Sequence, residues 1–386
     1  MNFKVKLSDF SDALQKALPA MPRKSTLPVL EHLSFSLENN LLKIIATDQD
    51  IIIMTNLEVE QREEGKILVP GFRINEIVRA LEKGDIEFIS DEETYNIEIK
   101  THKGKFKMKG LDESEYLDIP VLFSSSKPNL DENNPPAARF TKDELSRLAD
   151  KTYFAVSMDE FRPAMTGVLF QFKGEYVNAV STDSFRLVKA VCKSESGNFT
   201  NDLDIILPVR TVDLLRKVDD DSTLSTIETE GKITHARFDY GNTVLTSRII
   251  DEQFPAYESV IPYSNPFEAS IPQKSFLSSL KRVSIFASTS SHQVKASFES
   301  NVLTLIGEDE ESGTHGKEVL DCQYDQEPFS IGFNCKYLEM AIQNAEDDLG
   351  DDENIVMTFS ESNKPALIMP KANRELLTML IMPVKI

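Results

Sequence analysis

The chain has 386 residues, 63 of them acidic and 42 basic, with a formal net charge of −21. Its length predicts more than one domain, and its acidity argues against indiscriminate nucleic-acid binding unless the basic residues gather on one surface. No apolar run reaches the roughly 18 residues of a membrane span, and the first residues lack the apolar core of a signal peptide, so we expect a cytoplasmic protein.

Three segments of one pattern follow each other along the chain. The first has a strand and helix within 3–18, a strand, polar turn and strand over 42–54, and a strand and amphipathic helix within 66–85. In that second helix apolar residues such as Ile74 and Val78 fall three or four apart. The same order recurs in two further segments, at 138–152, 177–190 and 204–222 and at 269–283, 303–319 and 328–348.

The repeat spans about 130 residues, far longer than a solenoid unit of 20–50, so the segments are predicted to be whole domains of one architecture. The stretches 123–136 and 263–266 have the composition of linkers. Each domain should be α+β, with two helices on one face of antiparallel strands. In each segment a break is predicted between the last strand and its helix, at Pro70, Pro208 and Gly332. The predicted domains are 1–125, 137–262 and 263–386.

The polar run at 181–184 has the composition of an active-site mouth, but the repeat favours a turn. Thr182-Asp183 matches Thr47-Asp48 of the first segment, and such short polar side chains bond their own backbone in turns. An enzyme that uses Thr182, Asp183 and Arg186 remains the alternative.

Other metal and catalytic motifs are missing from the sequence. It contains no nucleotide-binding, hydrolase or zinc motif, and its three cysteines lack CxxC spacing, which favours reduced thiols. The acidic loop 307–313 lacks the glycine and glutamate spacing of a calcium loop. We therefore expect solvated acidic turns at 307–313 and 348–354.

The stretch 94–110 predicts a hairpin around Lys103-Gly104 whose second strand has one charged face. We expect one face to carry Lys103, Lys105, Lys107 and Lys109, and the other Phe106 and Met108. The strand is either a protected sheet edge or a partner for a strand beside the acidic loop 307–313 of a second chain. Because these stretches lie in the first and third domains, head-to-tail association would give a ring or an open filament.

Basic residues recur on the predicted helices. Arg210 and Lys217 are seven residues apart, as are Lys274 and Lys281, so each pair shares one helix face. Related helices carry Arg73, Arg79, Arg147 and Lys151. A solvated face explains any single pair, whereas the recurrence favours a surface that faces a polyanion.

The three tandem domains, TLPVL at 26–30, DEQFPAYESVIP at 251–262 and LIMPVKI at 380–386 together resemble the bacterial DNA polymerase III beta subunit family, the sliding clamps. The resemblance implies three tandem copies of the DNA-clamp domain in a head-to-tail homodimeric ring around double-stranded DNA, with antiparallel sheets outside and helices lining the inside. It also implies no enzymatic activity, cofactor, metal or membrane contact. The implied partners are the DNA polymerase III catalytic subunit, the ATP-driven clamp loader and other proteins with clamp-binding motifs.

The resemblance also implies site residues, position by position. The partner-peptide pocket would comprise Met165, Thr182, Ser184, Phe185, Arg186, Leu187, Pro255, Val260, Asn334, Tyr337, Leu380, Ile381, Met382, Pro383, Val384, Lys385 and Ile386. The dimer interface would comprise Lys103, Lys105, Phe106, Lys107 and Met108, facing Ile285, Phe286, Glu308, Glu310 and Glu311 of a second copy. DNA contacts would come from Arg23, Lys24, Arg73, Arg79, Arg210, Lys217, Lys274 and Lys281.

Some of these positions follow the family pattern more closely than others. Lys24 and Arg210 match DNA-contact positions of the family, whereas the other DNA candidates follow from helix placement. Ser184-Phe185 stand where Gly-His is common, and Ser259 stands where a basic residue is common. These departures bear on which peptides the pocket prefers.

Overall fold

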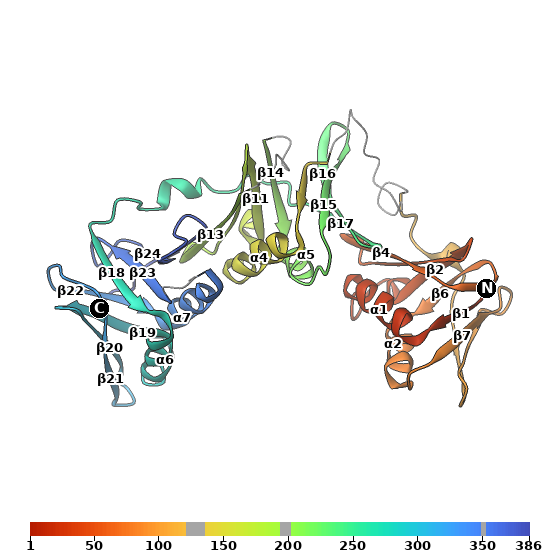
Figure 1. Ribbon diagram of the computed structural model, residues 1–386, viewed down its shortest axis with the longest axis horizontal. Coiled ribbons are helices and arrows are strands. Elements are labelled where there is room, and N and C mark those ends of the chain that lie inside the picture. The colour runs from red at the N-terminus through yellow and green to blue at the C-terminus, as the bar shows by residue number, and fades with distance from the viewer. Residues whose placement is uncertain (121–135, 194–201, 349–352) are drawn as a thin grey trace. The chain divides into compact units, whose positions relative to one another are not determined.

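A computed structural model describes residues 1–120, 136–193, 202–348 and 353–386 (Figure 1). The described chain divides into two compact units, and each is considered by itself. Unit 1 holds residues 1–120, 136–145 and 217–249, and unit 2 holds residues 146–193, 202–216, 250–348 and 353–386. The predicted linker at 123–136 lies, up to residue 135, outside the described residues.

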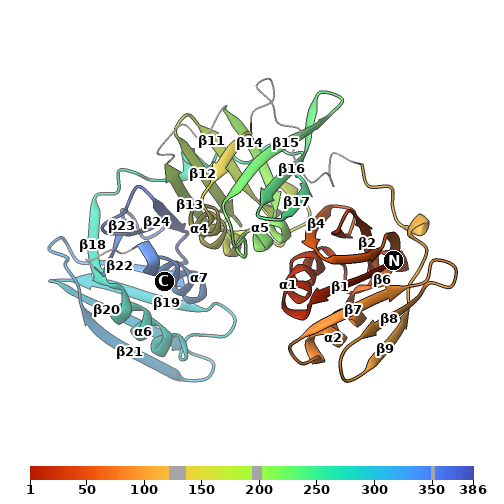
Figure 2. The ribbon, with the colours of Figure 1, turned by 45° about the vertical axis from the view of Figure 1, so that its right-hand side comes forward.

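Unit 1 is built on two antiparallel sheets. The five-stranded sheet has the order β5 (Glu60–Glu63), β1 (Asn2–Lys6), β7 (Asp85–Ser90), β8 (Asn96–Lys100) and β9 (Lys105–Lys109). The eight-stranded sheet has the order β10 (Ala138–Phe140), β15 (Ser222–Thr229), β16 (Lys232–Tyr240), β17 (Thr243–Arg248), β4 (Ile51–Glu58), β3 (Leu41–Thr47), β2 (His32–Glu38) and β6 (Gly65–Pro70). Helices α1 (Leu7–Ala17) and α2 (Gly71–Ala80) pack against each other, and α1 contacts strands of both sheets (Figure 2).

Unit 2 repeats this arrangement. Its eight-stranded sheet has the order β14 (Leu203–Pro208), β11 (Gly167–Lys173), β12 (Tyr176–Thr182), β13 (Arg186–Lys193), β25 (Leu377–Ile381), β24 (Ala366–Pro370), β23 (Asn354–Phe359) and β18 (Phe267–Pro272). Its four-stranded sheet has the order β21 (Thr314–Asp321), β20 (Val302–Asp309), β19 (Gln293–Glu299) and β22 (Phe329–Asn334). Helix α6 (Gln273–Ser284) packs on α7 (Cys335–Asn344), and α5 (Val209–Leu215) packs on β11 and β14. Within the described residues, no helix has the length and apolar character that crossing a bilayer requires.

The sheets run across the borders of the predicted domains. In unit 1, β17 of the central segment pairs with β4 of the first, so that Leu245 lies opposite Ile53. In unit 2, β13 of the central segment pairs with β25 of the last, so that Val188 lies opposite Met379. The α+β prediction is confirmed, because helices pack on antiparallel strands throughout. The domain borders at 125, 137 and 262 stay predictions.

Local sequence explains where most helices begin. Helix α4 (Lys142–Thr152) starts with a capping box, in which Thr141 N donates to Glu144 Oε2 at 2.7 Å and Glu144 N donates to Thr141 Oγ1 at 3.3 Å. Pro70 and Pro208 are the last strand residues before α2 and α5, as predicted. The prediction of a break at Gly332 is wrong, because β22 continues to Asn334 before α7 begins.

An aromatic cluster forms the core of each terminal domain. In unit 1, Phe3 stacks on Phe88 at 4.9 Å between ring centroids, and Phe10 of α1 meets Phe35 of β2 at 6.0 Å. The cluster therefore joins a helix to both sheets. In unit 2, Phe359 of β23 lies 4.6 Å from Phe329 of β22, which likewise links the two sheets. Such side chains dominate the burial energy of a core.

A buried ion-pair network ties α4 to the chain that follows α7. Arg147 donates from Nε to Asp348 Oδ1 at 2.8 Å, and Lys151 Nζ lies 3.4 Å from Asp348 Oδ2. Arg147 also donates to the carbonyls of Val191 and Leu376, at 3.0 and 3.1 Å. Asp348 is 6% exposed. The expected acidic surface turn is therefore wrong for Asp348, and Arg147 and Lys151 do not belong to a solvated basic face.

Replacement of Phe88 by alanine tests the aromatic core. Phe88 is fully buried, so Phe88→Ala should lower the free energy of unfolding by about 3–5 kcal/mol through lost burial and a cavity. Urea titration followed by circular dichroism measures the change. Phe161, which is 96% exposed, provides the matched control, since Phe161→Ala should change the free energy by no more than about 0.5 kcal/mol. Equal effects of the two substitutions would contradict this description of the core.

Candidate functional site

The polar run of the central segment forms a tight turn between β12 and β13. Asp183 Oδ1 accepts from Phe185 N and Arg186 N at 2.9 and 3.0 Å, and Thr182 Oγ1 accepts from Ser184 N at 3.2 Å. Ser184 has a positive φ of 77°, which the bonds on either side of it hold in place.

The matching turn of the first segment has the same bonds. Asp48 Oδ1 accepts from Asp50 N and Ile51 N at 3.1 and 2.7 Å, and Thr47 Oγ1 accepts from Gln49 N at 2.9 Å. Gln49 has a φ of 89°. The prediction of equivalent turns is confirmed, because the same polar atoms are engaged in closing both loops. In the third segment the turn between β20 and β21 is longer, as expected.

Arg186 connects this turn to helix α7. Its Nε donates to Asp183 Oδ2 at 2.9 Å, and one terminal nitrogen donates to Phe154 O at 2.7 Å. Its guanidinium carbon lies 4.6 Å from the ring centroid of Tyr337 on α7 and 5.6 Å from that of Phe154. Stacking of this kind is attractive when the cation is desolvated. Arg186 and Tyr337, both assigned to the predicted pocket, are thus in contact.

The last residues of the chain lie beside the same turn. Leu187 of β13 pairs with Leu380 of β25, and Met382 N donates to Phe185 O at 2.8 Å. Further on, Val384 N donates to Gly332 O at 2.9 Å.

Gly332 allows this approach of the chain end. A Cβ at residue 332 would lie 2.7 Å from Val384 O and 2.6 Å from Ile386 Cγ2. Gly332 is therefore needed for close packing of two backbones rather than for a break between strand and helix.

The segment 250–261 packs over an apolar cluster next to this turn. The cluster contains Leu169, Val180, Leu187, Ile206, Tyr257, Ile261, Leu367 and Leu380. Tyr257 donates its hydroxyl to Gln171 Oε1 at 2.8 Å, and burial raises the pKa of that hydroxyl. Burial also lowers the pKa of Lys189, whose ammonium lies 5.9 Å from the Tyr257 ring.

Sequence reasoning missed several residues of this region. Tyr257, Ile261 and Leu367 were not assigned to a site, although Tyr257 lies inside the AYESVIP stretch that marks the segment. Two assigned neighbours, Phe185 and Val260, are 58% and 54% exposed, so apolar surface remains open beside the cluster.

Two other predicted pocket residues, Met165 and Asn334, make local contacts near the turn and at the start of α7. Ser184 Oγ lies 3.7 Å from Met165 Sδ, which brings Met165 to the turn. The Asn334 side chain accepts from Lys336 N at 3.0 Å and caps α7. The described contacts therefore bring together the turn, the chain end and α7, while Asn334 has a helix-capping role.

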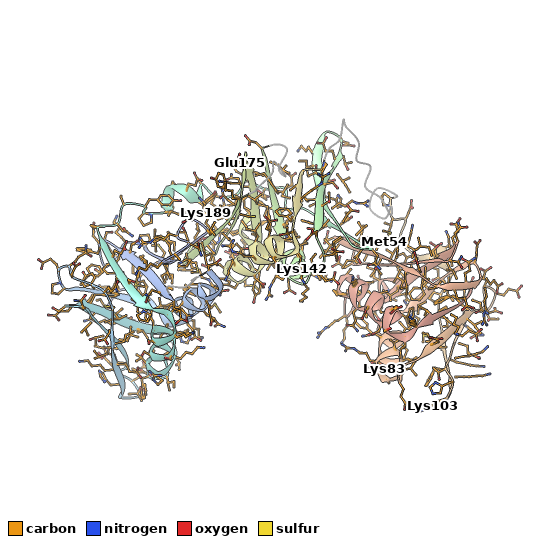
Figure 3. All side chains as sticks on the ribbon, in the orientation of Figure 1. Met54, Lys83, Lys103, Lys142, Glu175 and Lys189 are labelled. Carbon is orange, nitrogen blue, oxygen red and sulfur yellow. The ribbon has the colours of Figure 1, made fainter. Side chains whose placement is uncertain are left out.

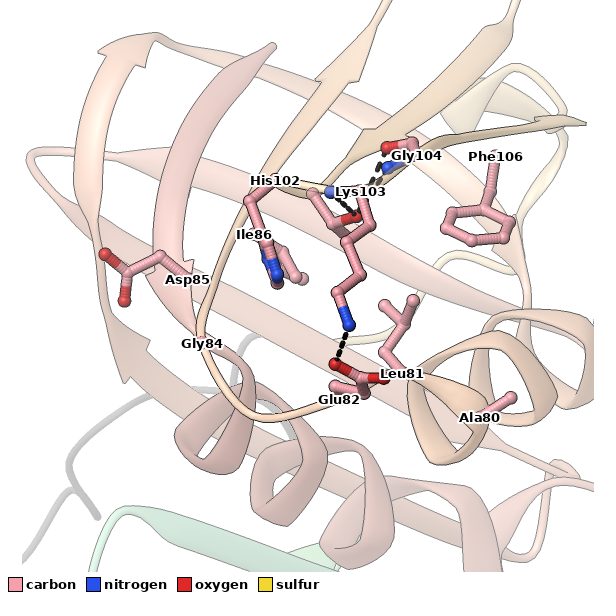
Figure 4. Close-up of a pocket in the computed structure, with 11 residues that line it drawn as sticks. Ala80, Leu81, Glu82, Gly84, Asp85, Ile86, His102, Lys103, Gly104 and Phe106 are labelled. Carbon is pink, nitrogen blue, oxygen red and sulfur yellow. Dashed lines mark hydrogen bonds and ion pairs between the residues drawn. The ribbon is translucent and has the colours of Figure 1, made fainter.

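The lysine-rich strand β9 is an edge of the five-stranded sheet. Beside it lies a pocket of about 190 Å3 lined by residues that include Leu81, Ile86 and Phe106 (Figure 4). Lys103 lines the same pocket and forms an ion pair with Glu82 (Figure 4). The expectation that Lys103 shares a strand face opposite Phe106 is wrong, because Lys103 lies in the hairpin turn before β9.

The acidic segment forms another sheet edge, in unit 2. Strand β21 is the outer strand of the four-stranded sheet, and Glu308, Glu310 and Glu311 are exposed at its junction with β20. Ile285 and Phe286, directly after α6, are 77% and 38% exposed. Both predicted halves of a dimer interface thus have exposed apolar side chains. Their charges are mixed, since Lys107 Nζ lies 3.4 Å from Glu98 Oε2 and Arg282 pairs with Glu318 of β21.

The predicted DNA-contact residues are exposed, and several have acidic neighbours. Arg73 pairs with Glu76 at 3.2 Å on α2. On α6, Lys274 lies 3.2 Å from Glu353, and Lys281 lies 3.7 Å from Glu339. The remaining candidates are exposed as well: Arg23, Lys24, Arg79, Arg210 and Lys217. Figure 3 draws the side chains of both units and labels four lysines among them: Lys83, Lys103, Lys142 and Lys189.

Comparison with known proteins agrees with these features. Family models of the DNA polymerase III beta subunit match in order: the N-terminal domain at residues 1–120, the central domain at 139–256 and the C-terminal domain at 258–385. The beta sliding clamp of Caulobacter vibrioides is 31% identical over 86% of this chain and 89% of its own length. That of Synechocystis is 27% identical over 98% of both.

Solved structures give the same result. The sliding clamp of Bartonella birtlesii, determined with bound griselimycin, superposes with a TM-score of 0.86 at 26% identity and covers 100% of both chains. The beta sliding clamp of C. crescentus, determined with polyethylene glycol, gives a TM-score of 0.86 at 25% identity and covers 100% of this chain and 99% of that one. The chain belongs to the DNA polymerase III beta subunit family, the beta sliding clamps.

Proposed function

We propose that this protein is a DNA sliding clamp, a ring-shaped homodimer that encircles duplex DNA and confers processivity on the replicative DNA polymerase. The observation that carries the proposal is the ordered match of all three beta-subunit domains along the chain. The domains are 1–125, 137–262 and 263–386. The protein acts in the cytoplasm without catalysing a reaction, and its polar run at 182–186 serves as a turn.

The charge distribution suits a protein that makes weak contacts with DNA phosphates. The net charge is −21, so DNA contact depends on local basic residues such as those on α2 and α6. Their acidic neighbours weaken each phosphate contact, and exposed ion pairs of this kind contribute little individually. Weak contacts to phosphates carry no base information. The result is sequence-independent binding that permits sliding.

The two charged sheet edges support head-to-tail association. Strand β9 offers lysines beside Phe106, and the β20–β21 junction offers exposed glutamates. Thr314, at the start of β21, donates to Phe286 O at 3.4 Å, which places the segment after α6 next to this junction. Opposite charges at the rim steer two copies into one register, while the exposed apolar side chains supply the buried centre.

The surface around Phe185 supports peptide docking. The partners are clamp-binding segments of the DNA polymerase III catalytic subunit, other polymerases, the clamp loader and repair proteins. Apolar side chains that stay exposed beside a rigid cluster offer anchor sites for a short peptide.

Topological linkage to DNA is the direct test of the function. Clamp loaded by its loader and ATP onto nicked circular duplex should co-elute with the DNA in gel filtration, because a closed ring cannot dissociate. After cutting by a restriction enzyme, the clamp should be lost through the free ends. Protein-blocked ends should restore retention. Retention on open linear DNA would contradict the proposal.

The dimer edges can be tested by burying a charge. Phe106→Asp and Ile285→Asp should each give monomers at the 43.5 kDa chain mass, because an unpaired carboxylate at a desolvated centre costs several kcal/mol. Light scattering measures the mass. Tyr176→Asp, at a half-exposed position of β12, is the control and should stay a dimer. Dimers of both edge variants would refute this assignment.

Removal of the chain end tests the peptide site. A chain lacking Met382–Ile386 should bind a clamp-binding peptide at least about tenfold more weakly, since the tail lies beside Phe185 and Gly332. Fluorescence anisotropy measures the affinity. Gly332→Ala should weaken binding in the same direction by displacing the tail. The dimer mass should not change in either variant, and unaltered peptide affinity in both would remove the tail from the site.

A further inference from the structure

The segment 251–262, which carries the predicted pocket residues Pro255 and Val260, packs over the apolar cluster of unit 2 through side chains. Among the described residues, its backbone hydrogen bonds span only two or three positions, and none reaches a strand. Ile250, directly before the segment, differs, since its N donates to Ile206 O of β14 at 2.9 Å. The position of the segment therefore depends on the side chains that hold it.

Tyr257 is the side chain that holds the middle of this segment. The structure describes all of residues 251–260, and among them Tyr257 alone is buried, with 5% exposure. Its ring packs in the apolar cluster together with Leu187 and Leu380. Leu187 directly follows the turn of the central segment, and Leu380 lies just before the chain end. The ring thus joins the segment to the two strands from which the rest of the predicted pocket extends.

The hydroxyl of Tyr257 gives this contact a direction. It donates to Gln171 Oε1 at 2.8 Å, and Gln171 Nε2 in turn donates to Asp204 Oδ2 at 3.0 Å. Because a carboxylate only accepts, Asp204 determines which end of the Gln171 amide faces the tyrosine. Gln171 and Asp204 lie opposite each other on β11 and β14, so the sheet fixes the acceptor. A longer contact joins the hydroxyl to Glu258 Oε1 at 3.3 Å.

Burial of the Tyr257 ring does not by itself require a hydroxyl. A phenylalanine would fill the same apolar cluster, whereas the hydroxyl loses its water on burial, a cost that the bond to Gln171 offsets. Burial raises the pKa of the hydroxyl, and the Glu258 carboxylate adds to this effect. The group therefore keeps its proton and donates at neutral pH.

We propose that Tyr257 and Gln171 are positioning residues of the partner-peptide surface. Their hydrogen bond sets where Val260 stands relative to Leu187 and Leu380, so that one bound peptide contacts the segment and the strands together. Val260 is three residues from Tyr257 and is 54% exposed, so its side chain is available to a ligand. The inference rests on the proposed function, because it needs a peptide that binds beside Val260.

Removal of one hydroxyl tests the role of Tyr257. Tyr257→Phe should bind a synthetic peptide, the clamp-binding segment of the cognate DNA polymerase III catalytic subunit, about fivefold more weakly, since one buried hydrogen bond is lost. Gln171→Met, which removes the acceptor, should weaken binding in the same direction. Fluorescence anisotropy measures the affinity, and circular dichroism shows that both variants are folded.

Tyr324 provides a control that is matched in chemistry. It is 1% exposed and donates its hydroxyl to Glu327 O at 2.5 Å, but its ring packs on Phe298 and Phe359, outside the cluster of Tyr257. Tyr324→Phe should lower the midpoint of urea unfolding about as much as Tyr257→Phe, while its peptide affinity stays within about 1.5-fold of the wild type. An equal loss of affinity in both variants would indicate a general effect of stability and overturn the proposal.

A double-mutant cycle tests whether Tyr257 acts through Val260. Val260→Ala should weaken peptide binding about threefold, and in that background Tyr257→Phe should weaken it by no more than about 1.5-fold further, because the side chain that Tyr257 positions is gone. A full fivefold loss in the Val260→Ala background, or unaltered affinity of either single variant, would overturn the inference. A wild-type chain that does not bind the peptide would instead refute the peptide surface of the proposed function, and the positioning role with it.

Discussion

Two strand pairings, β4 with β17 and β13 with β25, fix how the repeated segments of the chain are joined. Each is an antiparallel backbone ladder, so neighbouring segments share a sheet instead of meeting through side chains alone. Backbone hydrogen bonds that are buried must all be satisfied, and the ladder satisfies them at the border itself. Because β13 and β25 are adjacent, the turn at Ser184 and the chain end after Ile381 are brought side by side. The predicted partner surface therefore follows from the joining of segments.

The basic residues have two different roles, one in buried ion pairs and one on exposed helix surfaces. Inside unit 2, Arg147 and Lys151 are bonded to Asp348 and to backbone carbonyls, where losing one partner would strand a buried charge. On the exposed helices, basic residues keep contact with solvent and have acidic neighbours within 4 Å. Arginine and lysine side chains thus fix the packing of α4 where they are buried. Where they are exposed on helices, they are available to a polyanion. Burial, rather than sequence position, separates the two roles.

Local chemistry was predictable from the sequence, and long-range contact was not. The Thr-Asp turns at 47–48 and 182–183 were predicted correctly because their bonds join residues only two to four positions apart. Lys103 was misjudged because it lies in the hairpin turn and not in β9. Gly332 and Arg147 were misjudged because their roles depend on the tail and on Asp348, which are far away in the sequence. Tyr257 and Phe161 escaped notice for the same reason, since nothing in an apolar residue's neighbours reveals whether tertiary structure covers it or leaves it bare.

The tail that lies beside Gly332 has a consequence for solubility. The stretch after Ile381 carries Met382, Val384 and Ile386, and only Val384 N and Met382 N are bonded back to the protein through their amides. A side chain at 332 would lift this stretch away and leave an apolar segment with unpaired amide groups. Such segments pair readily with sheet edges of other molecules. Gly332 thus keeps these amides paired within the molecule as well as shaping the surface.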